Sequence, residues 1–341
     1  MKSLRITLCS LVLVWILSNS TLAEPSEFYD NQVYQIFSAA YEIAREVDSF
    51  DAFVADLDDP DYTSHEGVLY YKTTLLCYPG TKAEDTHIIP EGATAIYDSA
   101  FNSSDEPSLK TLQIPSTCTE IDPVMFDGYG LDRLEYYSVS PDNPSFADID
   151  GILVSADKST LISYPRGRML TSVTLPPSIQ RIGNQAFIRN SIIEEIVLPD
   201  GVQVIGDRSF EACTNLSSIS WGSSLSEIGV EAFIDCASIE KIVLPATLRI
   251  IYPLAFSQSH SLSSVILPEG LEEVGDFSFV GAPIREIHLP STIKSIGPII
   301  IGLDGPYEFK WPVKVHTVRD SFSDQFVRDN FLNYDIHYYE P

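Results

Sequence analysis

Residues 193–213 read IEEIVLPDGVQVIGDRSFEAC, and this segment is one unit of a repeat that runs through most of the chain. Apolar residues at its first, fourth and sixth positions predict a short strand. Pro199 ends that strand because it lacks the N–H group that would continue the ladder, and Gly206 permits a sharp bend. Phe210 is expected to fill the interior. One such unit cannot bury its apolar face alone, so neighbouring units must stack.

The repeat has a nearly constant period. A Phe follows a fixed anchor by eleven positions in seven units, whose anchors are Pro90, Pro115, Pro176, Pro199, Gly222, Pro245 and Pro268. From residue 176 onward the anchors step by 23, 23, 23, 23, 22 and 22 residues, to positions 199, 222, 245, 268, 290 and 312. Self-similarity at this period predicts a solenoid.

The unit resembles the BspA-type leucine-rich repeat, also described as the Treponema pallidum type, in its pattern L-x-x-I-x-LP-x-x-x-x-x-IG-x-x-AF-x-x-C. Residues 170–187 and 216–236 match this pattern nearly position by position, and the resemblance covers roughly residues 67–311. The local departures are Gly222 in place of Pro, Tyr252 in place of the bend Gly, and Ile301 in place of Phe. The resemblance implies an α/β, strand-rich leucine-rich-repeat solenoid whose short strands line a concave face.

The two ends of the chain differ from the repeats. Residues 1–23 read as a secretory signal peptide, with Lys2 and Arg5 before a twelve-residue apolar run. Residues 24–62 carry apolar side chains at helical spacing, which predicts an N-terminal helical cap; a partner-binding helix is the alternative. Residues 313–341 predict a strand, a helix and a strand, similar to the C-terminal cap that closes many BspA-type arrays.

The repeat region between these ends, residues 63–312, contains two longer units. Their middle segments predict β-hairpin insertions near residues 67–79 and 151–165, with turns at Lys72-Thr73 and Asp157-Lys158. Hairpins of this kind are expected to project from the stack. They can serve as binding edges or as structural elaboration.

The chain is strongly acidic. Its formal net charge is −27 at pH 7, and removal of residues 1–23 makes it −29 because two basic residues leave with no acid. Nucleic acid and anionic lipid both demand a basic face, so neither is an expected partner. No second apolar segment of spanning length follows the signal, and the mature protein is therefore predicted to be secreted or at the cell surface without spanning a membrane.

Two cysteines occupy equivalent repeat positions. Cys213 and Cys236 each lie fourteen residues after their anchors. Equivalent positions in neighbouring coils are roughly 5 Å apart, a separation that fits either a disulfide or a column of small buried thiols.

Residues suited to catalysis or metal binding form no recognisable motif. The six His, at positions 65, 87, 260, 288, 316 and 337, make no H-x-x-x-H or H-x-H pair. Nucleophile elbows and phosphate loops are also lacking, and Ser159 stands where a calcium loop starting at Asp148 would need an acid. The sequence therefore predicts no enzyme, no metal site and no cofactor. A hydrolase with its site between the N-terminal segment and the first hairpin is the minor alternative.

The side chains that point from the predicted strands onto the concave face are the candidate ligand-binding residues. Val197, Val243 and Ile266 form a ridge of exposed apolar groups, which suits protein recognition; simple β-propensity is the plain alternative. The full set is Glu195, Val197, Ser218, Ser220, Lys241, Val243, Ser264, Ile266, Glu286 and His288.

These features predict a secreted or cell-surface module for protein–protein interaction. The family resemblance implies an adhesin-like role toward an extracellular or host-surface protein. Our hypothesis is that such a ligand binds to the concave repeat face. The competing interpretation is a structural or assembly component of a surface or extracellular layer, in which the repeats pack against copies of themselves.

Overall fold

The computed structural model describes residues 50–51, 54–55, 60–80, 82–102, 108–297, 300–302, 313–330 and 334–340. Contacts within the chain divide it into two compact units, unit 1 (residues 1–147) and unit 2 (residues 148–341). The predicted signal peptide at 1–23 and all but a few residues of the predicted helical cap at 24–62 lie outside the described residues.

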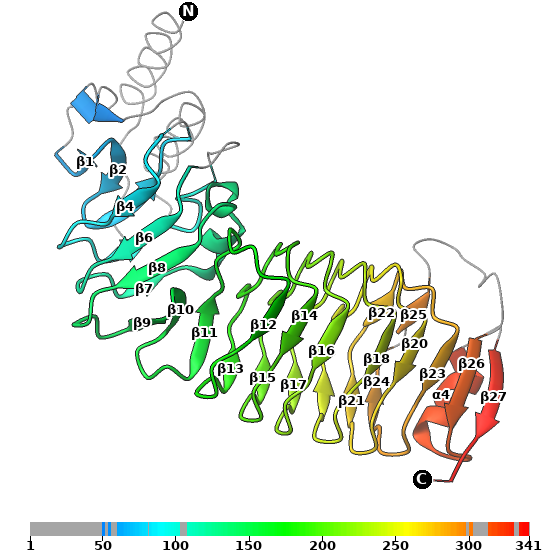
Figure 1. Cartoon of the computed structure of the whole chain (residues 1–341). Helices are drawn as coiled ribbons and strands as arrows, with labels where there is room; N and C mark the ends of the chain where they lie inside the picture. Colours follow the sequence, from blue (N-terminus) through cyan, green and yellow to red (C-terminus); the bar gives the residue numbers. More distant parts are fainter. Residues whose placement is uncertain are drawn as a thin grey trace, which may run out of the picture. The chain divides into compact units, whose positions relative to one another are not determined.

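Unit 2 is a stack of coils that follow one another in chain order (Figure 1). Each coil contributes a three-residue strand, ended by the Pro or Gly anchor two residues later. Neighbouring strands pair in parallel with equivalent residues opposite each other, as Val243 and Ile266 do. The strands are β12 (Ser172–Thr174), β14 (Glu195–Val197), β16 (Ser218–Ser220), β18 (Lys241–Val243), β20 (Ser264–Ile266) and β23 (Glu286–His288). The first and third side chains of these strands form the surface called here the long-strand face.

A second parallel sheet runs along the coils of unit 2. Its two-residue strands are β13 (Arg181–Ile182), β15 (Val204–Ile205), β17 (Glu227–Ile228), β19 (Ile250–Ile251), β21 (Glu273–Val274) and β24 (Ser295–Ile296). These strands were not predicted from the sequence, because two residues are too few to show an alternation. A third pairing joins β22 (Phe279–Val280) to β25 (Ile301–Gly302).

The bend glycine has a different physical role from the one predicted. Gly206 does not adopt a positive φ, whereas Arg208 two residues later does, at 53°. A Cβ on Gly206 would lie 2.5 Å from Asn184 Oδ1 and 2.9 Å from the carbonyl carbon of Gly183. Glycine is therefore required here by the close approach of successive coils rather than by the bend itself.

An aromatic column fills the interior of unit 2. Phe187, Phe210, Phe233, Phe256 and Phe279 are each at most 1% exposed. Their rings stack in sequence with centroid separations of 4.7, 4.9, 5.1 and 5.5 Å and interplanar angles of at most 9°. Tyr164 begins the column at 5.0 Å from Phe187, and Ile301 follows Phe279 in the parallel register.

The repeat position fourteen residues after the anchor forms a second buried column. The thiols of Cys213 and Cys236 are free and buried. Each donates to the carbonyl of the Phe in the preceding coil, Cys213 Sγ to Phe187 at 3.1 Å and Cys236 Sγ to Phe210 at 3.2 Å. Burial raises the pKa of Cys213 to about 12. Of the two arrangements that the sequence left open, the structure has the buried thiols.

Unit 1 has the same two kinds of strand. Its long strands are β4 (Thr86–Ile88), β6 (Thr111–Ile114) and β8 (Tyr136–Val139), which form one parallel sheet. A second sheet has the order β1 (Tyr62–His65), β2 (Val68–Tyr71), β3 (Thr74–Cys77), β5 (Ala95–Ile96) and β7 (Glu120–Ile121). Tyr78 begins the aromatic stacking here, 5.5 Å from Phe101.

Antiparallel hairpins lie within residues 67–79 and 151–165. The first pairs β2 with β3, and the second pairs β10 (Ile152–Ser155) with β11 (Thr160–Ser163). β3 pairs in parallel with β5, and β11 pairs in parallel with β13. Each hairpin therefore extends the sheet of short strands in its unit, which corrects the expectation that the hairpins project from the stack. Asp150 and Gly151, both at positive φ, form the turn before β10.

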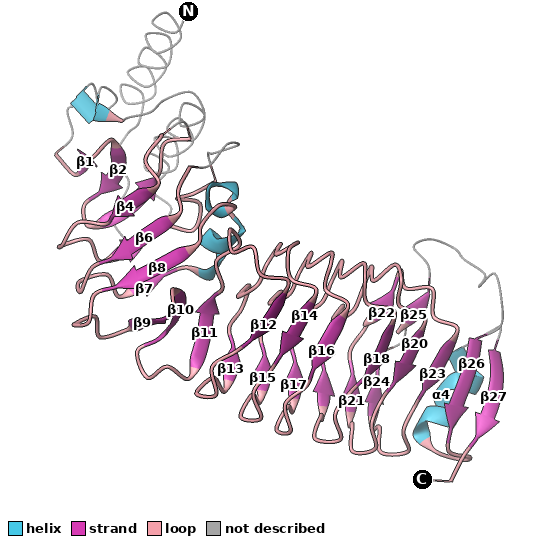
Figure 2. Cartoon of the chain, in the orientation of Figure 1, coloured by secondary structure: helices cyan, strands magenta, loops and turns pink. Residues whose placement is uncertain are grey.

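The C-terminal elements follow the predicted order of strand, helix and strand. They are β26 (Val313–Thr317), α4 (Phe322–Asn330) and β27 (Tyr334–Tyr338). β26 pairs in parallel with β23, and β27 pairs with β26. Among the described residues, α4 and the 3-10 turns η1 (Pro123–Asp127) and η2 (Tyr129–Leu131) supply nearly all the helix (Figure 2). The strand-rich solenoid is confirmed, and the α/β label overstates its helical content.

One coil departs from the repeat at two adjacent residues, Trp221 and Gly222. Trp221 stands where the neighbouring coils have Leu, and its ring meets Phe233 edge-on at a centroid distance of 5.8 Å. A Cβ on Gly222 would lie 2.2 Å from the carbonyl oxygen of Pro199. The usual Pro cannot occupy this position, so the departure is a packing requirement of this coil.

Gly222→Ala is expected to lower the free energy of unfolding by about 1–3 kcal/mol, because the new methyl group overlaps a backbone carbonyl of the preceding coil. Gly201→Ala is the matched control, since its Cβ would meet no atom closer than 3.6 Å. That variant should be neutral or stabilised by about 0.4–1 kcal/mol through the unfolded state. Urea unfolding measures both, and equal stabilities would contradict the packing explanation.

Candidate protein-interaction surface

The ten predicted binding residues all lie at outward positions of the long strands in unit 2. Each strand turns its middle residue inward and its first and third side chains outward, because successive residues of a strand point to opposite faces. The middle residue is buried in every strand of the set except β16, where Ile219 is half-buried. β14 illustrates the pattern, with Ile196 1% exposed and Val197 39% exposed. The ten are Glu195, Val197, Ser218, Ser220, Lys241, Val243, Ser264, Ile266, Glu286 and His288.

The apolar residues of this set differ in exposure. Val243 is 50% exposed. Ile266, directly opposite it in the register, is less exposed than Val243. His288 follows Ile266 one coil later. An exposed apolar side chain costs free energy in water, and Val243 is the most exposed apolar side chain of the set.

The long strands of unit 2 form two ladders. One has the order β12-β14-β16, and the other has the order β18-β20-β23-β26-β27. The structure thus brings Val243, Ile266 and His288 together in one register, while Val197 and Ser220 are register partners in the other ladder. The division falls at the coil that contains Trp221 and Gly222.

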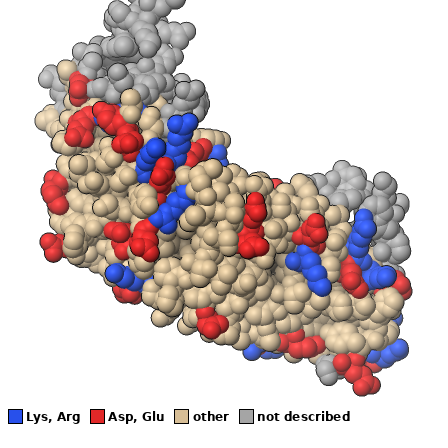
Figure 3. Space-filling view, viewed as in Figure 1, with Lys and Arg blue, Asp and Glu red and all other residues tan. Residues whose placement is uncertain are grey.

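Charged side chains flank the apolar positions. Glu195, Lys241 and Glu286 occupy the first positions of β14, β18 and β23, next to the column of Val197, Val243 and His288. Figure 3 shows acidic and basic side chains dispersed over the visible face, with uncharged areas between them. Charged and apolar side chains therefore lie next to each other on the long-strand face.

Sequence reasoning missed two residues that extend the same column. His316 on β26 lies opposite His288, and His337 on β27 lies opposite His316. The rings of His288 and His316 stack at 4.0 Å with an interplanar angle of 4°, and His337 stacks on His316 at 5.1 Å. Burial, followed by the nearby His316, lowers the pKa of His288 below its ordinary value. These two residues can be found only from the pairing of β26 and β27 with the repeat strands. The spacing of residues along the chain does not reveal that pairing.

Unit 1 also exposes apolar side chains on its long strands. Ile88 on β4 and Tyr136 on β8 are each 50% exposed. Tyr136 and Thr86 flank Thr111 in the register of their sheet. Outward apolar residues on the long strands are therefore a property of both units.

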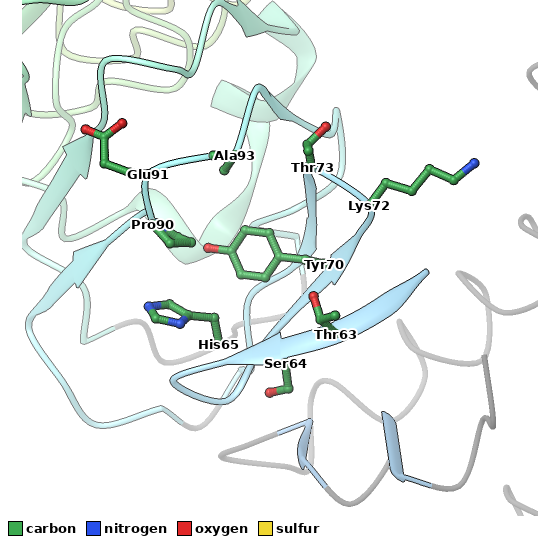
Figure 4. A pocket seen from close by; sticks show the side chains of 10 residues that line it. Thr63, Ser64, His65, Tyr70, Lys72, Thr73, Pro90, Glu91 and Ala93 are labelled. Atoms are coloured by element: carbon green, nitrogen blue, oxygen red, sulfur yellow. The ribbon is translucent and has the colours of Figure 1, made fainter. Parts of the chain in front are cut away.

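A pocket of about 290 Å³ lies beside the first hairpin in unit 1 (Figure 4). It is lined by residues 63–65 of β1, by Tyr70, Lys72 and Thr73, and by residues 90–93. Ser64 and His65 are consecutive on β1 and point in different directions in Figure 4. Nucleophilic catalysis needs the hydroxyl within hydrogen-bonding reach of its base, and the Ser64 hydroxyl is not directed at the His65 ring in this arrangement.

Behind this pocket lies a buried histidine. His87 is 0% exposed, and its Nε2 lies 3.2 Å from the hydroxyl of Tyr70. Its Nδ1 is 3.9 Å from the carboxylate of Glu66. Burial lowers the pKa of His87 to about 4, and the positive charge of Lys82 contributes in the same direction. The ring is therefore a neutral core residue at physiological pH.

In the part of the chain that the structure describes, no helix has both the length and the apolar character needed to cross a membrane.

No curated protein matches the chain. A family model for the BspA type leucine rich repeat region matches six copies, over residues 77–143 and 180–301.

Solved structures with a similar fold are bacterial repeat proteins. A leucine-rich repeat protein from Eubacterium ventriosum is 21% identical, with 67% of each chain covered and a TM-score of 0.51. The pneumococcal vaccine antigen PcpA is 22% identical over 74% of this chain and 61% of its own, with a TM-score of 0.48. A leucine rich cell surface protein from Faecalibacterium prausnitzii is 23% identical over 65% of this chain and 60% of its own, with a TM-score of 0.49.

Similarity at these identities concerns the fold alone, and the chain spans only 61% of PcpA and 60% of the Faecalibacterium protein. The repeat itself is decisive, since the family model covers more than half of the chain. The stacked coils, the aromatic column and the paired strands are what that repeat builds. The chain belongs to the BspA-type leucine-rich repeat family.

Proposed function

We propose that this protein is a secreted or cell-surface interaction module that binds a protein ligand through the long-strand face of unit 2. Stacked short repeats present an extended surface, and the outward side chains of the long strands lie along it. The signal peptide predicted at residues 1–23 supports export of the chain. An adhesin-like role at a surface, which the family resemblance implies, is the finer form of the proposal.

The observation that carries the proposal is the half-exposed Val243 in register with Ile266. A valine that is 50% exposed on a sheet leaves half of its apolar side chain in contact with water. Charged residues next to it, Lys241 on the same strand and Glu286 two coils later, supply a polar rim. Interfaces of this kind place a few apolar contacts at the centre and charged groups at the edge.

Val243→Lys is expected to weaken ligand binding at least tenfold, or by about 1.4 kcal/mol, because it places a charge in the centre of the buried contact. The full-length chain is tested against immobilised extracellular-matrix and cell-surface proteins at low and high salt. Each protein that binds saturably is then titrated with the variant.

Val124→Lys is the matched control, since Val124 is 43% exposed and belongs to η1 rather than to a long strand. It should bind like the unaltered chain. Saturable binding that Val243→Lys and Ile266→Lys both leave intact would rule out this face. Self-association of the folded chain without any ligand would favour the structural or assembly role instead.

A further inference from the structure

Three side chains at the end of the long-strand face form a compact group of metal-type donors. Glu286 and His288 belong to β23, and His316 belongs to β26. One donor atom from each lies within 4.8 Å of the other two. His316 Nε2 is 2.9 Å from Glu286 Oε1. The parallel register places His288 opposite His316, so the pairing of two strands builds the group.

We propose that Glu286, His288 and His316 bind a divalent transition-metal ion, with zinc as the type ion. Imidazole nitrogen and carboxylate oxygen are ligands that Zn²⁺ prefers, and two His with one Glu is a set that holds it with a fourth position for water. Mg²⁺ and Ca²⁺ select oxygen ligands instead. Cu²⁺ and Ni²⁺ suit the same nitrogen donors, so they are expected to bind as well.

The donors need only a small movement to reach a metal. Ligand atoms about 2.0–2.1 Å from a tetrahedral ion lie roughly 3.3 Å from each other, compared with separations of up to 4.8 Å in the group. Both side chains reach solvent, since His316 is 23% exposed and Glu286 is 42% exposed. The rings of His288 and His316 must tilt away from their stacked arrangement, and the His316–Glu286 hydrogen bond is exchanged for two metal bonds.

Charged residues next to the group show why only Glu286, His288 and His316 are proposed as ligands. His337, next in the column, is 3.1 Å from Asp335 on its own strand and is therefore engaged by another carboxylate. Lys314 is the register partner of Glu286. Its positive charge competes with a metal ion for the negative charge of the Glu286 carboxylate. The proposed ligands therefore come from two adjacent strands only. A bound ion would join the last repeat strand, β23, to the C-terminal strand β26.

The test uses the full-length chain, purified without a polyhistidine tag and stripped with a chelator. Zn²⁺ is titrated by calorimetry, and Co²⁺ is added separately so that its visible d–d bands report the coordination geometry. Glu286→Gln, His288→Asn and His316→Gln are each expected to weaken Zn²⁺ binding at least about tenfold and to abolish tetrahedral Co²⁺ bands. His260→Asn is the control, because His260 is an exposed histidine bonded to the Gly281 carbonyl.

Binding of one Zn²⁺ per chain that the three variants lose and His260→Asn keeps would support the site. A rise in the thermal midpoint on adding Zn²⁺ should disappear in the same three variants, because only the folded chain assembles the ligands. Zn²⁺ affinity that is unchanged in His288→Asn and His316→Gln would overturn the proposal. Equal losses in all four variants would also overturn it, since they would indicate scattered binding to single histidines.

Discussion

Phe233→Ala is expected to lower the free energy of unfolding by about 3–5 kcal/mol. Phe233 is 0% exposed, and removal of its ring leaves a cavity at the centre of the aromatic column. It also removes two stacked contacts, with Phe210 at 4.9 Å and with Phe256 at 5.1 Å, each contributing about 0.5–1.5 kcal/mol. Urea unfolding followed by circular dichroism measures the change.

Phe322→Ala controls for the loss of a phenyl ring as such. Phe322 is 48% exposed at the start of α4, so its replacement should change the free energy of unfolding by no more than about 0.5 kcal/mol. If the two variants unfold at the same urea concentration, the column does not hold the coils together.

Acidification is expected to destabilise unit 1 through His87. The ring is neutral in the folded state, where its pKa is about 4, and its ordinary value is 6.5. Above pH 6.5 neither state is protonated, so His87 contributes nothing there. Below pH 6.5 His87 binds a proton in the unfolded chain but stays neutral in the folded chain. The free energy of unfolding therefore falls until the pH approaches 4. The full loss is about 3 kcal/mol, at roughly 1.4 kcal/mol for each pH unit of the shift.

His87→Gln removes this titration and keeps a group that can bond to Tyr70. The difference in unfolding free energy between the unaltered chain and the variant should therefore depend on pH between about 6.5 and 4 and be constant above that range. A difference that is the same at pH 4 and pH 7 would show that burial does not hold His87 neutral.

The parts of the fold that could be predicted from the sequence are those that recur with the repeat period. The interval from Pro199 to Phe210 identified both the end of a long strand and the member of the aromatic column, because each coil repeats the same packing. The outward position of Val243 followed from strand alternation alone. For Cys213 and Cys236 the shared repeat position allowed either a disulfide or a column of buried thiols. The sequence alone did not decide between these two arrangements.

The parts that sequence missed depend on contacts between coils. The short strands such as β15 arise only when a second coil supplies hydrogen-bond partners. The requirement for glycine at Gly206 and Gly222 reflects the approach of a neighbouring backbone, which no local pattern encodes. The group of Glu286, His288 and His316 escaped the search for paired histidines because its members come from adjacent strands that lie far apart along the chain.

The most direct test of the proposed binding face is site-specific photo-crosslinking. A photoreactive residue replaces Ser220, an exposed position opposite Val197 on the long-strand face, and in a second variant it replaces Val124. Each variant is irradiated with the protein ligand identified by the binding panel. We expect a crosslinked complex from position 220 and none from position 124. Crosslinking from position 124 with none from position 220 would contradict this expectation.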